Sequence, residues 1–124
     1  MTGKSSLFDS NIIIYLSKRE LPLSFIDDFE DLFISVITYM EILGYNFENK
    51  KEESFVKDPL SIFRIIYIDH TIVNLVIDIR RNNRIKLPDA IISATATTKD
   101  LHLVTRNVDD FKSINTFIIN PFDS

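Results

Sequence analysis

Three acidic residues interrupt otherwise apolar segments of the sequence. Asp9 stands in "LFDSNIII", Glu41 in "ITYMEILG" and Asp89 in "KLPDAII". A carboxylate among apolar residues is costly unless it is paired, hydrogen-bonded or bound to a metal ion. No abundant basic partner lies directly beside any of the three in the sequence. If the three carboxylates converge, their repulsion raises their pKa values unless a divalent cation lies between them. The residue types and their settings therefore favour a metal site.

The rest of the composition limits which metal and which chemistry this would be. There is no cysteine, and the two histidines, His70 and His102, are scattered and expected to be structural. Oxygen ligands favour Mg²⁺ or Mn²⁺ over zinc, and such cations suit the hydrolysis of phosphodiesters. Each acid also has a plain structural interpretation: Asp89 as a helix-dipole residue, Asp9 as a turn residue and Glu41 as an exposed helix residue. The residues alone leave both interpretations open.

The length and composition are those of an ordinary folded domain. The 124 residues, of which 45% are hydrophobic and 26% charged, predict a single domain over residues 1–124. The net charge of −4 gives no general attraction to nucleic acid, so such binding needs a local basic patch. No apolar run approaches the roughly 18 to 20 residues that span a bilayer, and the first residues lack the apolar core of a signal peptide. We therefore expect a cytoplasmic protein without membrane association.

Apolar runs of strand length alternate with longer stretches of helical period. Continuous apolar strands separated by helices are typical of a mostly parallel sheet of four or five strands, with helices on both faces in a three-layer α/β/α sandwich. The polar segment 48–59 predicts a pair of helices with a loop. The expected strands are 6–8, 31–35, 62–69, 101–105 and 116–120, and the expected helices are 11–19, capped by Ser10 or Asn11, 36–47, 71–83 and 88–99.

Several polar residues fall where the expected strands end. Asp9 follows the first strand, Asp69 follows the third, and Thr105 closes the fourth. Glu41 lies in the helix that leaves the second strand, and Asp89 opens the helix before the fourth. Ligands of parallel α/β sheets bind beyond the carboxyl ends of the strands. We therefore expect these residues to lie at one edge of the sheet.

Four segments together resemble a known family. The blocks "LFDSNIIIYL", "ISVITYMEILGY", "RIKLPDAIISATA" and "LVTRNVDDF" are similar, in order and spacing, to the signature blocks of PIN domains, particularly the small stand-alone toxins of the VapC type. The resemblance covers about residues 7–120. It implies a Mg²⁺- or Mn²⁺-dependent endoribonuclease, a homodimer and a cognate antitoxin that blocks the active site. It also implies that Asp9, Glu41 and Asp89 hold the metal.

The fourth acidic position of the family departs from its usual pattern. An acid often follows Thr-Arg there, whereas this chain has Asn107. An asparagine can still offer an oxygen at the site, and Asp110 could replace the acid if the turn brings it inward, with Asp109 facing solvent. The candidate catalytic residues are therefore Asp9, Glu41, Asp89, Asn107 and Asp110.

Neighbouring residues could support the acids or bind substrate. Ser10, Asn11 and Thr105 could orient the acids, although capping and turn roles suit the same residue types. The basic stretch 79–86 sits at a helix end, where cations complement the helix dipole, and it could equally contact RNA phosphates. The candidate RNA contacts are Arg80, Arg81, Arg84, Lys86 and Arg106.

Two other functions compete with a toxin nuclease. The first is a PIN-like module with weak or no catalysis that acts by binding RNA or a partner, and both Asn107 and the acidic net charge favour it. The second is a phosphoacceptor α/β domain, which also places an aspartate at a strand end. That function fits poorly, because the sequence lacks a second acid close after Asp9 and a lysine at a late strand end.

Overall fold

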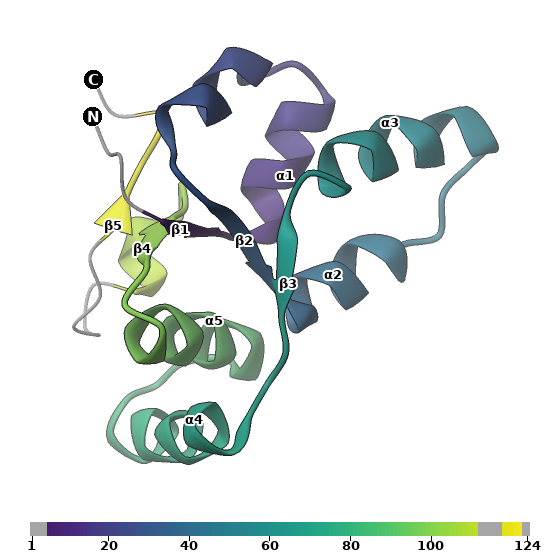
Figure 1. Cartoon of the computed structure of the whole chain (residues 1–124). Coiled ribbons are helices and arrows are strands. Elements are labelled where there is room, and N and C mark those ends of the chain that lie inside the picture. The colour runs from purple at the N-terminus through teal and green to yellow at the C-terminus, as the bar shows by residue number, and fades with distance from the viewer. Residues whose placement is uncertain (1–4, 112–117, 123–124) are drawn as a thin grey trace.

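The computed structural model describes residues 5–111 and 118–122, which form a parallel sheet of five strands flanked by helices (Figure 1). The strands lie in the order β3-β2-β1-β4-β5, and every neighbouring pair is parallel. The prediction of an α/β fold with a mostly parallel sheet is confirmed. The strand bounds are β1 Ser6–Phe8, β2 Leu32–Ser35, β3 Arg64–Ile66, β4 His102–Val104 and β5 Ile118–Ile119.

The helices of the described residues pack in two groups. α1 packs on α3 with α2 beside both, whereas α4 packs on α5. None of the described helices combines the length and apolar character needed to cross a membrane. The bounds are α1 Ser10–Ser17, α2 Val36–Leu43, α3 Lys50–Leu60, α4 His70–Asn82 and α5 Leu87–Thr98, with short 3-10 helices η1 Leu23–Asp28 and η2 Val108–Asp110.

Successive side chains of β1 point to opposite faces of the sheet, so the core is divided between these two faces. Phe8 is fully buried among residues of α1 and α3, and its ring meets those of Phe29 and Phe63 edge to face at 5.0 and 5.1 Å. Leu7, which points to the opposite face, packs in a second cluster with Ile92 of α5. A third cluster fills the space between α5 and α4. These clusters produce the three layers of the sandwich.

Helix α5 is the buried element that carries Asp89. Residues 90–96 are all buried, because the helix lies between the sheet and α4. Small side chains such as Ala90 and Ala94 allow the close contact with α4. Pro88 stands in the first turn, where its fixed backbone angle favours the start of a helix. Asp89 follows it in the same turn and so lies at the start of α5, beside the sheet.

The helix predicted over 36–47 is wrong at its C-terminal end. α2 stops at Leu43, and the N–H of Gly44 donates to the Met40 carbonyl at 2.8 Å. A Cβ atom at Gly44 would lie 2.7 Å from that carbonyl oxygen, closer than carbon and oxygen tolerate. Glycine therefore suits the close approach of the chain at this helix end.

Other predicted bounds also need correction. Segment 48–59 was expected to form a pair of helices, yet it belongs mostly to the single helix α3, which Asn49 caps by accepting a hydrogen bond from the Glu52 N–H at 2.8 Å. The cap of α1 is Asp9, not the predicted Ser10 or Asn11. The strand predicted over 62–69 shortens to Arg64–Ile66, because only these residues pair with β2. Residues 116 and 117 of the last predicted strand lie outside the described residues.

Candidate active site

The central strand β1 and its neighbour β4 bring Asp9 and Thr105 together. Phe8 pairs with Val104 in the sheet, so the next residues of the two strands leave its carboxyl edge side by side. Thr105 is fully buried, and its hydroxyl donates a hydrogen bond to Oδ2 of Asp9. The chain continues from β1 to β2 on one side, whereas β4 lies on the other. Open α/β sheets bind ligands at such a switch point.

Asp9 also caps helix α1. Its Oδ1 accepts a hydrogen bond from the Ile12 N–H at 3.2 Å, and the residue is only 5% exposed. Burial raises the pKa of Asp9 to about 6 and the charge of Asp89 adds to the rise, although the hydrogen bonds from Thr105 and Ile12 lower it. The environment therefore disfavours an isolated negative charge here, and a nearby cation would offset that cost.

Asp89 is the electrostatic neighbour of three other carboxylates. Partial burial raises its pKa, the charge of Asp110 raises it further, and Lys86 lowers it. The charge of Asp89 in turn raises the pKa values of Asp9 and Glu41. Four acids from four parts of the chain therefore share one region at the carboxyl edge of the sheet.

Glu41 reaches this region from α2. Partial burial of its carboxylate raises its pKa and the charge of Asp89 adds to the rise, while the nearby Ser10 side chain lowers it. Thr38 lies three residues earlier, on the same side of the helix as Glu41. Thr38 is fully buried, and among the described residues its hydroxyl has no hydrogen-bond partner. An orphan hydroxyl of this kind can bind an ordered water.

The acids suit a hard divalent cation by charge and donor type, without forming a closed ligand cage. Among residues 5–111 and 118–122, no three Asp, Glu or His side chains are close enough to hold one metal ion together. Charge repulsion acts over longer distances than metal–ligand bonds. Acids that are too far apart to bind one ion together can therefore still raise one another's pKa values. Oxygen donors with excess negative charge are the ligands that Mg²⁺ and Mn²⁺ prefer. The oxygen donors and the negative charge of these acids therefore match what such a cation binds.

The loop after β4 carries the two candidates for the fourth position. The N–H of Asn107 donates to Oγ1 of Thr105 at 3.0 Å, and the Asn107 side chain is exposed. Asp110 ends η2, and its charge acts on Asp89. Asp109 is exposed. Of the two candidates, Asp110 is the one whose charge acts on another acid of the site, Asp89.

Asp69 does not join this group, so the prediction that it shares their edge is wrong. It caps α4 by accepting from the Ile72 N–H at 2.9 Å and pairs with Lys99 at 2.9 Å. Both contacts lower its pKa, the hydrogen bond from Ile72 more strongly. Lys99 follows the last residue of α5, whereas Asp89 lies in its first turn, about 15 Å away along the helix axis.

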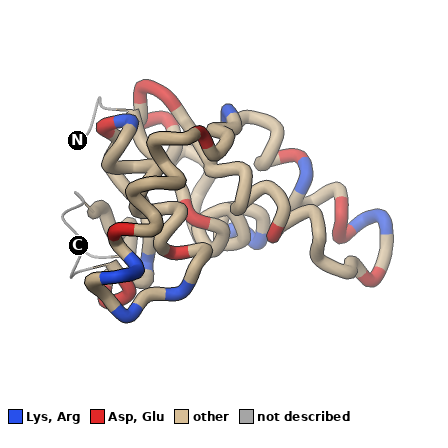
Figure 2. The backbone as a smooth tube through the Cα atoms, turned by 90° about the horizontal axis from the view of Figure 1, so that it is seen from below, with Lys and Arg blue, Asp and Glu red and all other residues tan. Residues whose placement is uncertain are grey.

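Basic residues gather near the acids at the turn between α4 and α5. Arg80 and Arg81 stand in the last turn of α4, and Arg84 and Lys86 follow it. Arg80, Arg84 and Lys86 help to line a shallow hollow of about 580 Å³. Lys86 lies close enough to Asp89 to lower its pKa. Figure 2 shows Lys and Arg positions close together on this side of the molecule. Their contact with RNA stays a prediction.

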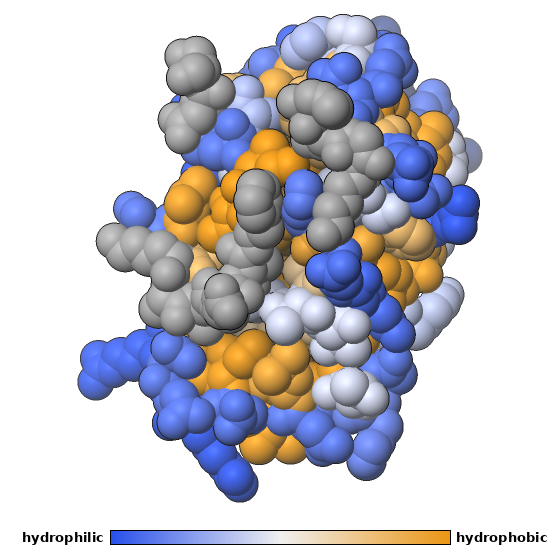
Figure 3. All heavy atoms as spheres, turned by 60° about the vertical axis from the view of Figure 1, so that its left-hand side comes forward, coloured by the Kyte–Doolittle hydropathy of each residue, from blue (hydrophilic) through white to orange (hydrophobic). Residues whose placement is uncertain are grey.

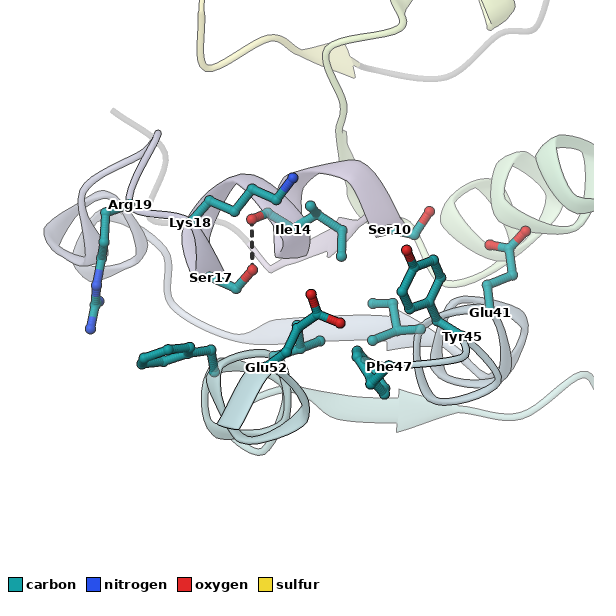
Figure 4. A pocket seen from close by; sticks show the side chains of 12 residues that line it. Ser10, Ile14, Ser17, Lys18, Arg19, Glu41, Tyr45, Phe47 and Glu52 are labelled. Atoms are coloured by element: carbon teal, nitrogen blue, oxygen red, sulfur yellow. Dashed lines mark hydrogen bonds between the residues drawn. The ribbon is translucent and has the colours of Figure 1, made fainter. Parts of the chain in front are cut away.

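An apolar groove of about 780 Å³ opens beside the acids, between α1, α2 and α3 (Figure 4). Glu41 and Ser10 lie at one end of the groove and Lys18 toward the other. The rings of Tyr45 and Phe47 meet edge to face at 5.3 Å in its wall. The Tyr45 hydroxyl points toward Ser10. The groove therefore joins an aromatic surface to the acidic region.

Tyr15 and Phe122 lie near the site and gave no signal in the sequence. Both contact Arg106, whose guanidinium carbon lies 5.5 Å from the Tyr15 ring centroid and 4.4 Å from that of Phe122. Tyr15 belongs to an apolar stretch typical of a core helix, and Phe122 lies beyond the segment that resembles PIN domains. Their contact depends on the pairing of β5 with β4, which no local pattern reports.

Comparison with known proteins identifies the family. The family model of the PIN domain matches residues 6–116. A chain of a toxin–antitoxin complex from Klebsiella pneumoniae is 34% identical, with a TM-score of 0.71 over 97% of this chain and 100% of that chain. FitAcB from Neisseria gonorrhoeae is 26% identical, with a TM-score of 0.77 over 95% and 99% of the two chains. VapBC2 from Rickettsia felis, bound to a promoter DNA fragment, is 21% identical, with a TM-score of 0.78 over 93% and 97%. No curated protein sequence matches significantly.

The parallel sheet, its flanking helices and its acidic carboxyl edge define a PIN-like α/β protein. The chain belongs to the PIN-domain family. Its neighbours among solved structures are toxin–antitoxin complexes of the VapBC and FitAB types, so the predicted resemblance to VapC-type toxins is confirmed.

Proposed function

We propose that the protein is a Mg²⁺- or Mn²⁺-dependent endoribonuclease and the toxin of a toxin–antitoxin pair, with residues 1–124 as a single nuclease domain. The observation that carries this proposal is the shared region of Asp9, Glu41, Asp89 and Asp110 at the carboxyl edge of a PIN-domain sheet. Such a concentration of negative charge is unfavourable in a protein unless it serves to hold a cation. Membership of the PIN-domain family supports nuclease chemistry.

Asp9, Glu41 and Asp89 are the proposed metal ligands. A divalent cation supplies the positive charge that stabilises a phosphoryl group as it is attacked. The Thr105 hydroxyl and the backbone N–H of Ile12 hold Asp9 in place, and the Asn11 backbone lies close enough to lower the pKa of Asp9.

The remaining polar residues support the ligands in this proposal. The Ser10 hydroxyl lies close enough to the Glu41 carboxylate to lower its pKa, so it can help to orient that carboxylate. The exposed Asp110 carboxylate can accept the proton of a water that attacks the phosphorus, because it lies near Asp89. Asn107 can orient that water through its amide.

The basic turn between α4 and α5 is the proposed contact with RNA phosphates. Because the chain has a net charge of −4, RNA must bind through a local patch. Lys86 connects this patch to the acids through its effect on Asp89. The residues assigned to this contact are Arg80, Arg81, Arg84 and Lys86.

The groove beside Glu41 is the proposed seat of the antitoxin. Tyr45 and Phe55 both line it and are 64% and 55% exposed, so the groove presents a contiguous apolar surface of the kind that a partner segment covers. A partner segment that fills the groove reaches Ser10 and Glu41 at its end, where it can block access to the acids.

A homodimer is also part of the proposal. Val73 and Ile77, one turn apart on α4, are 41% and 45% exposed. Figure 3 shows an apolar area in the lower part of the molecule, at the height of α4 and α5. The molar mass in solution tests this state: the wild type is expected to be a dimer, and the double variant Val73→Glu, Ile77→Glu a folded monomer. A monomeric wild type contradicts it.

Cleavage of total cellular RNA by purified, partner-free protein tests the function. We expect discrete fragments with Mg²⁺ or Mn²⁺ and none with EDTA. Asp9→Asn and Asp89→Asn should abolish cleavage while circular dichroism shows a folded protein, since asparagine also caps helices well. Asp69→Asn is a matched control, because Asp69 caps a helix as Asp9 does but lies away from the acids. It should cut like the wild type.

Two outcomes would contradict the proposal in different ways. If the folded wild type cuts no RNA with either cation, the protein is better described as a binding module, the alternative that Asn107 motivates. If Asp9→Asn or Asp89→Asn keeps its activity, the nuclease site lies elsewhere.

A further inference from the structure

The side chain of Arg106 is engaged with two aromatic rings instead of a carboxylate. Its guanidinium carbon lies 4.4 Å from the ring centroid of Phe122 and 5.5 Å from that of Tyr15. Its Nη1 donates to the Tyr15 hydroxyl at 3.2 Å, and the two rings meet edge to face at 4.8 Å. Within the described part of the chain, Arg106 makes no ion pair.

These three residues come from three separate segments: α1, the loop after β4, and the stretch after β5. Helix α1 begins at its cap Asp9, and the loop begins with Thr105, which is bonded to Asp9. The Thr105 N–H donates to the Ile119 carbonyl at 3.0 Å, which ties the loop to β5. The contacts of Arg106 with Tyr15 and Phe122 therefore join, near the surface, the same segments that meet at Asp9 in the interior.

We propose that Arg106 is a positioning residue. Its stack on Tyr15 and Phe122 holds the loop 105–110 against α1, and the loop held in this way keeps its hydrogen bond to Asp9. The effect on cleavage rests on the proposed nuclease function, whereas the effect on the loop does not.

The chemistry of arginine separates this role from a contact with RNA phosphate. A guanidinium is planar and stacks on aromatic rings, whereas a lysine ammonium carries the same charge without the plane. Arg106→Lys therefore keeps a charge contact with phosphate but weakens the stack. Phe122→Leu weakens the stack without any change of charge.

Kinetics on an oligoribonucleotide with a mapped cleavage site provide the first test. We expect Arg106→Lys and Phe122→Leu each to lower kcat by about ten- to hundredfold, with KM within about twofold of the wild type, because the acids lose their alignment. Arg64→Lys is a matched control, since Arg64 also stacks on a ring, that of Phe33 at 5.5 Å, but lies at the start of β3. It should keep the wild-type kcat.

The opposite kinetic pattern would overturn the proposal. If Arg106→Lys keeps its kcat while Arg106→Ala raises KM, and Phe122→Leu has no effect, Arg106 contacts phosphate. The salt dependence of oligonucleotide binding in EDTA also distinguishes a phosphate contact from a positioning role. A lost phosphate contact in Arg106→Ala lowers the slope of log K against log salt by about 0.7, whereas a lost positioning residue leaves it unchanged.

Hydrogen exchange at the Asn107 amide tests the loop independently of activity. This N–H is bonded to Thr105 at 3.0 Å, so it should exchange about tenfold faster in Arg106→Lys and Phe122→Leu than in the wild type. Unchanged exchange overturns the positioning role, whether or not the protein cuts RNA. Faster exchange in a protein that cuts no RNA supports this role and refutes the proposed function alone.

Discussion

The hydroxyl of Thr105 donates a hydrogen bond to the carboxylate of Asp9, although 96 positions separate the two residues in the sequence. The contact exists because β1 and β4 are neighbours and Phe8 pairs with Val104, which places the following residues side by side. Thr105 also accepts a hydrogen bond from the Asn107 N–H. One buried side chain therefore links the first acid to the loop of the proposed fourth position.

Thr105→Val should destabilise the protein and raise the pKa of Asp9 above about 6. The variant keeps the shape of the side chain but leaves the Asn107 N–H and a carboxylate oxygen without their partner, at a cost of about 1–3 kcal/mol. Urea unfolding measures the first effect and a carbon-13 titration of the carboxyl group the second. Thr105→Ser, which keeps the hydroxyl, is the control. An unchanged pKa of Asp9 in the valine variant would show that the bond is unimportant.

The metal-free protein should lose stability between pH 4 and 7 because of Asp9. Its pKa rises from 3.8 in the unfolded chain to about 6 in the folded one, so the folded state binds the proton more tightly. This stabilisation is complete below pH 4 and is lost as the pH rises through about 6, a change of about 3 kcal/mol. Unfolding in EDTA of wild type and Asp9→Asn measures the difference. A constant difference across this range contradicts the raised pKa.

The basic turn should carry the salt dependence of RNA binding. Replacing Arg80, Arg84 and Lys86 together by glutamine removes three positive charges, so the slope of log K against log salt should fall by about 2 if each contacts one phosphate. Fluorescence anisotropy of a labelled oligoribonucleotide in EDTA measures this slope. Lys50→Gln with Lys51→Gln, at the start of α3, is the control and should leave the slope unchanged. An equal loss in both variants would indicate a general effect of charge.

If the groove seats the proposed antitoxin, Phe55→Asp should weaken antitoxin binding without loss of the proposed cleavage. Phe55 lines the groove and is 55% exposed, so an aspartate there disfavours an apolar partner segment at little cost to the fold. Growth of cells that co-express the cognate antitoxin, together with RNA cleavage by purified protein, measures both properties. Tyr67→Asp is the control, because Tyr67 is 67% exposed but does not line the groove. If the antitoxin still protects cells from Phe55→Asp, it does not depend on this part of the groove.

The sequence by itself determined the class of fold and the identity of the main acids. Apolar periodicity reports which residues are buried, so the alternation of helices and strands and the buried helix around Ala94 were predictable. Asp9 and Asp89 stood out because each is an acid in an apolar segment. Element ends were less predictable, since the stop of α2 depends on a backbone contact between Gly44 and Met40.

The tertiary structure decided which of the polar residues meet. Asp69 follows a strand as Asp9 does, yet Lys99 and the start of α4 hold it away from the other acids. Thr105 reaches Asp9 only because β4 lies beside β1, and Arg106 finds its rings only because β5 lies beside β4. Periodicity along the chain specifies which face of an element is buried but not its neighbours in the sheet. The order of the strands therefore had to come from the folded structure.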